Sequence, residues 1–153
     1  PFLYHSRVMV TPVPVTVALV AVRVEPGSVL PEIEPKKTAE AEETFVARSL
    51  EFRPFEPLAG PLKLNLTFVL PVPKSAPRKL KDQVEDRERL YPDGPQHNPP
   101  HTKRPDLDNL EKLVKDACNG VFWKDDSQVY HVIKRKVYGA IPRTIVRIEE
   151  VDG

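Results

Sequence analysis

The chain has 153 residues, a net charge of +1 and one cysteine. This length fits a single domain, residues 1–153, that can bury a hydrophobic core. One cysteine excludes an internal disulfide framework and a zinc site built from several cysteines. No apolar run reaches the length of a membrane span, and the N-terminus lacks the pattern of a secretory signal. We therefore expect a cytoplasmic protein with no membrane partner.

The first half of the chain alternates between proline-rich stretches and predicted regular structure. Residues 1–14 form a proline-rich segment, and the valine-rich run Val15–Val24 predicts a buried strand. Residues 36–52 predict a helix, because apolar residues recur at helical spacing and acidic residues occupy its first turns. Leu62–Leu70 alternates apolar and polar residues, which is typical of a half-buried strand.

Residues 71–105 predict a long basic loop, within which Lys79–Leu90 is compatible with a short helix. Connections of this length in a compact domain are usually functional or mobile. Two interpretations stay open: a flap that faces DNA, and a surface loop without a role.

The most informative stretch is 103–129, which predicts one amphipathic helix with carboxylates at both ends. Pro105 and Asp106 are signals for a helix start, and Gly120 is a signal for its end. Between them, apolar residues recur at i, i+3, i+4 and i+7, which predicts one buried face. That face comprises Leu110, Leu113, Val114, Ala117 and Val121. Cys118 lies on its flank and is expected in the core, as is Trp123 after the helix.

The polar residues of this stretch are the candidates for chemistry. Asp108, Lys112 and Asp116 fall on the side of the helix away from the leucines, and Asp125 and Asp126 follow a short turn after it. Mg²⁺ prefers oxygen ligands, commonly one or two carboxylates with waters and phosphates, so a divalent ion would explain the acidic cluster. Helix capping, an ordinary i,i+4 ion pair and a common turn composition are the alternative explanations.

The C-terminal part predicts two strands, Val129–Tyr138 and Thr144–Ile148, of which the last is antiparallel. No acidic residue occurs between Ser127 and Glu149. The basic residues of that span are Lys134, Arg135, Lys136, Arg143 and Arg147. A basic surface beside an acidic cluster suits a DNA nuclease, while a solvated sheet face is the plainer alternative. We expect a mixed α/β or α+β domain with one four-stranded sheet and two helices, in the order β-α-β-α-β-β.

Two blocks of the chain resemble the signature of the RusA family of Holliday junction resolvases. The first block is Arg104-Pro105-Asp106-Leu107-Asp108-Asn109-Leu110, followed by Lys112 and by Asp116-Ala117-Cys118-Asn119-Gly120. The second block is Trp123-Lys124-Asp125-Asp126-Ser127-Gln128-Val129. The chain departs from the family at Cys118, where leucine is usual. It departs again after the first predicted strand, where Arg23 is nearly alone and the usual basic segment is missing.

The resemblance implies Mg²⁺-dependent cleavage of four-way DNA junctions by a homodimer, with Mn²⁺ as a substitute ion, in recombination and repair. It places the protein in the cytoplasm of a bacterial or phage-infected cell. The implied catalytic residues are Asp106, Asp108, Lys112 and Asp126. The three aspartates are the implied metal ligands, with Asp116 and Asp125 ranked second. The expected contacts to nucleic acid are His101, Lys103, Arg104, Lys134 and Lys136.

Three other functions stay open at this point. The altered N-terminal segment is compatible with a junction-binding protein that has lost catalysis. The same carboxylates would serve a nuclease that cuts flaps and other branched DNA. A structural domain with a capped, ion-paired helix is the third alternative.

Overall fold

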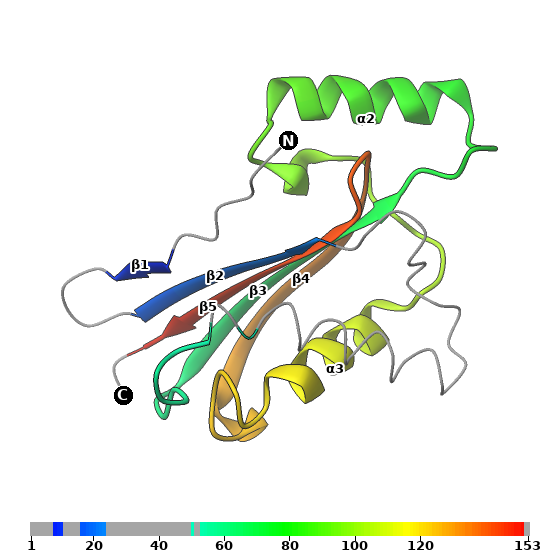
Figure 1. Ribbon diagram of the computed structural model, residues 1–153. Helices are drawn as coiled ribbons and strands as arrows, with labels where there is room; N and C mark the ends of the chain where they lie inside the picture. The colour runs from blue at the N-terminus through cyan, green and yellow to red at the C-terminus, as the bar shows by residue number, and fades with distance from the viewer. Residues whose placement is uncertain (1–7, 11–15, 24–49, 51–52, 152–153) are drawn as a thin grey trace.

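The described chain forms one β-sheet with two α-helices on it (Figure 1). The computed structural model describes residues 8–10, 16–23, 50 and 53–151. The sheet has the strand order β1-β2-β5-β3-β4. Its strands are β1 (Val8–Val10), β2 (Thr16–Arg23), β3 (Leu62–Pro71), β4 (Val129–Gly139) and β5 (Arg143–Glu150). The helices are α2 (Arg78–Leu90) and α3 (Leu107–Cys118), with short 3₁₀ turns η2 (Pro95–His97) and η3 (Asp126–Gln128).

Strand β3 has β4 and β5 as its neighbours in the sheet. It pairs in parallel with β4 and antiparallel with β5. Leu62, Leu64, Leu66 and Phe68 are buried on one face, as the alternation predicts, and Thr67 is buried as well. The last strand is antiparallel to both its neighbours, as predicted, but these are β2 and β3, because β3 separates β5 from β4.

Helix α3 covers the apolar face of β3 and β5, which confirms the amphipathic pattern. Its buried residues are Leu110, Val114, Ala117 and Cys118. These pack in one cluster with the apolar residues of β3, with Val146 and Ile148 of β5, and with Phe122 and Trp123 after the helix. Trp123 is 0 % exposed, so its predicted role as a core residue is confirmed. Gly120, just beyond the helix, has a positive φ of 78°, as expected of a glycine that ends a helix.

The strand count predicted from the sequence is wrong. The sheet has five strands and not four, although the mixed α+β class holds. The mixed parallel and antiparallel part is β5-β3-β4, and β2 and β1 extend it on the β5 side. The extra strand, β1, is three residues long and lies in the proline-rich segment, where no periodic pattern is long enough to reveal it.

The predicted order β-α-β-α-β-β also needs correction. The helix predicted for residues 36–52 lies almost entirely outside the described residues. Within residues 71–105, the short helix expected at Lys79–Leu90 is confirmed as helix α2. It lies across one end of the sheet (Figure 1), where Glu88 accepts a hydrogen bond from the backbone N–H of Ala140 at 2.9 Å. Among the helices of the described ranges, none is long and apolar enough to cross a membrane.

Gly139 allows a close approach between the ends of β4 and β3. A Cβ atom added there would overlap Cγ1 of Val69 and lie 3.2 Å from Oε1 of Glu88. We expect Gly139→Ala to lower the free energy of unfolding by about 1–3 kcal/mol, as overpacking usually does. Ala140→Ser, at the exposed neighbouring position, is the matched control. Urea unfolding measures both, and an unchanged midpoint for Gly139→Ala would contradict the close approach.

Candidate active site

Two aspartates stand exposed where α3 begins. Asp106 is the N-cap residue, and its carbonyl oxygen accepts the first helical hydrogen bond, from the N–H of Leu110 at 3.2 Å. Its side chain makes no capping hydrogen bond. Asp108 lies in the first turn with its side chain 91 % exposed. The first turn of a helix favours negative charge, and both side chains face solvent.

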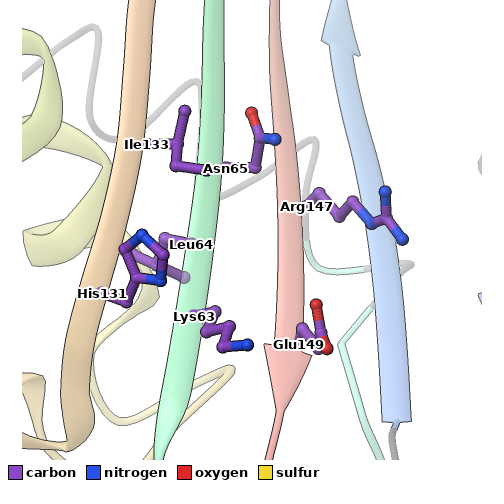
Figure 2. Close-up of a pocket in the computed structure, with 7 residues that line it drawn as sticks. All are labelled: Lys63, Leu64, Asn65, His131, Ile133, Arg147 and Glu149. Carbon is purple, nitrogen blue, oxygen red and sulfur yellow. The ribbon is translucent and has the colours of Figure 1, made fainter.

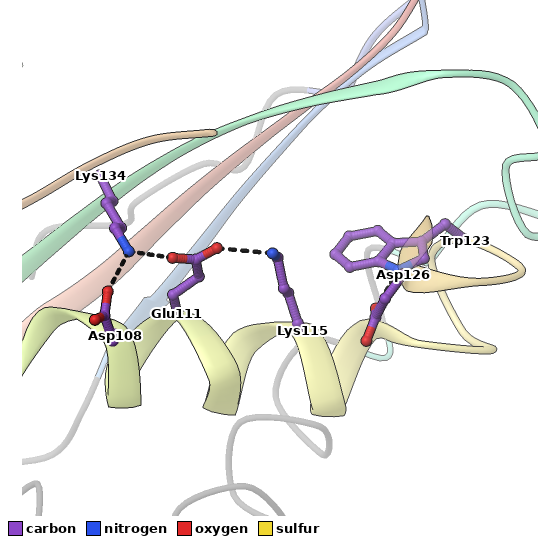
Figure 3. Close-up of polar contacts among 6 residues, drawn as sticks. All are labelled: Asp108, Glu111, Lys115, Trp123, Asp126 and Lys134. Carbon is purple, nitrogen blue, oxygen red and sulfur yellow. Dashed lines mark hydrogen bonds and ion pairs between the residues drawn. The ribbon is translucent and has the colours of Figure 1, made fainter. Parts of the chain in front are cut away.

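A lysine of β4 bridges Asp108 to a second carboxylate of α3. Nζ of Lys134 lies 2.6 Å from Oδ1 of Asp108 and also contacts the Glu111 carboxylate (Figure 3). Glu111 is 15 % exposed and pairs in addition with Lys115 at 2.7 Å. The hydrogen bond from Lys134, together with its charge, holds the pKa of Asp108 below its ordinary value. The ammonium group of Lys134 is therefore the cation that Asp108 contacts.

Glu111 joins this cluster although the sequence analysis did not single it out. Burial alone would raise the pKa of Glu111, but hydrogen bonds from Lys115 and Lys134 outweigh it and lower the pKa. The pairing with Lys115 is an i,i+4 pair that could have been inferred from the sequence. The pairing with Lys134 could not, because it spans 23 positions of the chain and depends on how α3 packs on β4.

The segment before Asp106 runs beside β4. The N–H of His101 donates to the carbonyl of Lys136 at 3.0 Å, and the N–H of Tyr138 donates to the carbonyl of Pro99 at 2.9 Å. The ring of His101 packs on that of Tyr138, with centroids 4.6 Å apart. Burial, and then the charge of Lys136, lower the pKa of His101. The imidazole is therefore neutral at pH 7 and is poorly suited to hold a phosphate by charge.

The other basic residues predicted to contact nucleic acid differ in their surroundings. Lys103 and Arg104 are exposed, and the peptide bond between Arg104 and Pro105 is cis. The ammonium group of Lys136 donates to the carbonyl oxygens of Lys103 and Pro105. Lys134 and Lys136 thus point toward α3 and the segment that leads into it, and not toward an open basic surface.

At the other end of α3, Asp126 is held by the buried indole of Trp123. Nε1 of Trp123 donates to Oδ1 of Asp126 at 2.8 Å (Figure 3). The carboxylate also lies near Cys118, and burial, reinforced by this negative charge, raises the pKa of the thiol. Cys118 is therefore a neutral core residue, as expected from its place on the apolar flank.

Asp125 is a capping residue of η3. Its carboxylate accepts hydrogen bonds from the backbone N–H of Ser127 at 3.1 Å and from the Ser127 hydroxyl. The Gln128 side chain accepts in return from the N–H of Asp125 at 2.7 Å, which completes a capping box. The hydrogen bond from the Ser127 hydroxyl lowers the pKa of Asp125. One oxygen of this carboxylate is thus already engaged in local structure.

The two acidic ends of α3 are far apart. Asp108 and Cys118, the neighbour of Asp126, are separated by ten positions of a helix, or about 15 Å at the usual rise. Lys134, the partner of Asp108, stands five residues into β4 from Val129, or about 16 Å along the strand. Among the residues that the structure describes, no group of three or more His, Cys, Asp or Glu side chains is arranged to hold a metal ion. The structure brings Asp106 and Asp108 to one end and does not bring Asp126 to them.

Lys112 and Asp116 lie between these two ends. Both are exposed, so they occupy the solvent side of α3 as the helical spacing predicts. Lys112 is one turn after Asp108, and Asp116 is one turn further toward Asp126. The assignment of Asp106, Asp108, Lys112 and Asp126 as catalytic, and of their metal, stays a prediction.

The opposite face of the sheet carries further strand cations. Arg135 donates to Oδ1 of Asn65 at 3.1 Å and to Oγ1 of Thr67 at 2.9 Å, so its side chain links β4 to β3. A pocket on this face is lined by residues of β3, β4 and β5, including Lys63 and Arg147 (Figure 2). The basic residues that follow Ser127 in the sequence are therefore divided between the two faces and do not form one continuous surface.

Comparison with known proteins places these features in a family. A family model described as "Endodeoxyribonuclease RusA" matches residues 23–149. This range includes both blocks of the aspartate motif, all of α3, and nearly all of β5. The chain is also similar to the "Uncharacterized protein YqaN" of Bacillus subtilis (strain 168). The two are 33 % identical over 121 residues, which cover 78 % of this chain and 79 % of the relative.

The contact between Lys134 and Asp108 predicts that the pKa of Asp108 changes when Lys134 is replaced. In Lys134→Met, Asp108 loses a hydrogen bond and a neighbouring positive charge, both of which favour the ionised carboxylate. We expect its pKa to rise toward the ordinary value. The stability that this pair contributes is present above the unfolded pKa of aspartate and is lost as the pH falls through the lower folded value. Carboxyl-carbon NMR titration measures the shift.

Lys63→Met is the control for this titration, because Lys63 lies on the opposite face of the sheet. It should leave the titration of Asp108 unchanged. An Asp108 titration that is the same in Lys134→Met and in the unmodified protein would mean that the two groups are not in contact in solution.

Proposed function

Because the chain belongs to the RusA family of endodeoxyribonucleases, we propose that it is a structure-selective endodeoxyribonuclease. In this proposal it resolves four-way DNA junctions by Mg²⁺-dependent hydrolysis of phosphodiester bonds, in recombination and repair. The observation that carries the proposal is the family match over residues 23–149, which contains the whole aspartate motif. The exposed carboxylates at the start of α3 supply an accessible place for the chemistry.

A divalent ion fits the start of α3 and does not fit all three predicted ligands at once. Mg²⁺ takes one or two carboxylates and completes its shell with waters and substrate phosphates, at about 2.1 Å from each oxygen. Asp106 and Asp108, two residues apart and both exposed, supply the number of carboxylates that Mg²⁺ commonly takes. Asp126 does not join them, because it lies near Cys118, about 15 Å along α3 from Asp108. We therefore assign the ion to Asp106 and Asp108, with Mn²⁺ as a substitute.

The residues around this pair have separate roles in the proposal. A divalent ion supplies charge neutralisation and an activated water to phosphodiester hydrolysis. We assign the contact with the scissile phosphate to Lys112, which is exposed one turn after Asp108. Lys134 keeps Asp108 ionised through its hydrogen bond. Asp126 is retained as a catalytic residue that acts apart from the pair, with its carboxylate oriented by Trp123.

DNA binding in this proposal uses exposed cations near the motif. Lys103 and Arg104 precede Asp106 and are exposed, so phosphates held there would lie next to the carboxylates. Each such contact releases counterions and makes binding depend on salt. We propose a homodimer, because a four-way junction has two-fold pseudo-symmetry that a two-fold dimer would match.

The first test of the proposal is cleavage of a mobile four-way junction by the purified protein, beside a linear duplex and a flap, with and without Mg²⁺. We expect paired, symmetric nicks in the junction that require the ion. Nicks in the flap at an equal or higher rate would favour a nuclease for other branched DNA. Absence of cleavage from every substrate in Mg²⁺ and Mn²⁺ would overturn the proposal.

The aspartates at the start of α3 should be essential for cleavage. Asp106→Asn and Asp108→Asn each remove a charge that would hold the ion, whose transition-state stabilisation amounts to several kcal/mol. We expect the single-turnover rate to fall by roughly a hundredfold or more, with junction affinity nearly unchanged. Asp93→Asn, at an exposed position on the loop after α2, is the matched control.

Full Mg²⁺-dependent cleavage by Asp108→Asn would contradict the assignment. The Asp126→Asn variant completes the series. Loss of cleavage together with unchanged Mg²⁺ binding would support a role for Asp126 apart from the ion, whereas loss of Mg²⁺ binding would mean that the two ends of α3 come together during the reaction.

A junction-binding protein without catalysis is the second candidate function. Two observations favour it: Lys134 already compensates the charge of Asp108, and the described residues hold no group of three acidic side chains arranged for a metal. Tight binding of the junction with no nicks, even in Mn²⁺, would select this candidate.

A further inference from the structure

A lysine on β4 is bonded to the backbone that leads into the acidic motif. Nζ of Lys136 donates to the carbonyl oxygens of Lys103, at 2.6 Å, and Pro105, at 2.7 Å. A lysine ammonium group has three N–H donors, so these two bonds occupy most of its capacity. Hydrogen bonds from a charged donor are roughly twice as strong as neutral ones. The interaction therefore restrains the two residues on either side of Arg104.

The same strand holds the segment further upstream. The carbonyl of Lys136 accepts from the N–H of His101 at 3.0 Å, and Pro100 forms an isolated bridge with Val137. Residues 99–101 thus follow the edge of β4 through their backbone. Residues 103 and 105 are bonded to β4 through the Lys136 side chain. The attachment continues to the residue immediately before Asp106.

Asp106 is the next residue after this attachment. As the N-cap residue it lies at the junction of the segment and α3, and its side chain makes no capping hydrogen bond that would orient it from the helix. The Pro105 carbonyl that Lys136 binds belongs to the peptide bond that supplies the backbone N–H of Asp106. That backbone is held by Lys136.

We propose that Lys136 is a positioning residue, which fixes the Asp106 carboxylate at the start of α3 by binding the carbonyls of Lys103 and Pro105. The inference rests on the proposed function for its catalytic consequence. It replaces the role expected from the charge pattern, in which Lys136 contacts a DNA phosphate. A misplacement of about 1 Å in a reacting group can reduce a rate by about a hundredfold, so the loss should appear in the chemical step.

The two roles predict different behaviour for Lys136→Met. A positioning role predicts a single-turnover rate lowered by about 10- to 100-fold at saturating junction. It also predicts a junction Kd within about twofold of the unmodified protein and an unchanged dependence of binding on salt. Lys136→Arg should restore most of the rate, because a guanidinium group can donate to two carbonyls. Lys103→Met removes an exposed cation of the same segment. It should instead weaken junction binding and lower the slope of log affinity against log salt concentration by about one.

Hydrogen exchange provides a readout that needs no cleavage. Peptides that cover residues 101–110 should exchange faster in Lys136→Met than in the unmodified protein, and Lys136→Arg should return them toward the original rate. Lys63→Met, on the opposite face of the sheet, is the control for a general loss of stability and should leave this exchange unchanged.

Two results would overturn the inference. Suppose that Lys136→Met binds the junction more weakly, with the slope of log affinity against log salt concentration lowered by about one, and that exchange over residues 101–110 is unchanged. Lys136 would then be a phosphate contact. An unchanged rate and unchanged exchange would leave it without a role in the motif. Failure of the unmodified protein to cut any branched DNA would overturn the proposed function, while the exchange measurement would still decide whether Lys136 orders the segment.

Discussion

The parallel pairing of β3 with β4 is the constraint on which the candidate site depends. Two parallel strands cannot be joined by a tight turn, so the chain must cross back over the sheet between them. Helix α3 makes that return on the apolar face and runs antiparallel to β4. Its first turn consequently lies beside Lys134 and the segment held by Lys136, and its last turn lies beside the start of β4. The motif is spread along α3 for this reason.

Successive side chains of β4 point to opposite faces of the sheet, so its basic residues make different contacts. Lys134 and Lys136 point toward α3 and its lead-in segment, whereas Arg135 points to the other face and binds Asn65 and Thr67. Exposed ion pairs contribute little to stability, typically up to about 1 kcal/mol. This applies to the pair of Lys134 with the exposed Asp108, whose effect is on the ionisation of that carboxylate. Lys134 and Lys136 contact the acidic helix and the segment before it, and their contacts to nucleic acid stay a prediction.

Local sequence patterns predicted most of the central helices and strands. They did not predict very short strands or the order of the strands in the sheet. The apolar spacing from Leu110 to Ala117 predicted the buried face of α3, and the alternation from Leu62 to Phe68 predicted the core face of β3. Strand β1 escaped because three residues among prolines carry no period. The place of β5 between β2 and β3 escaped because strand order is decided by packing between distant segments.

The family of the chain, the course of α3 and the core role of Trp123 could all be predicted from the sequence, since each follows from local spacing and residue chemistry. The tertiary structure alone decided which charges meet. It paired Lys134 with Asp108 and Glu111, directed Lys136 to the backbone before Asp106, and separated Asp126 from Asp108 by the length of α3. The physical reason is that these contacts join residues 23 to 33 positions apart, and their geometry is set by how a crossover helix packs on a parallel strand pair.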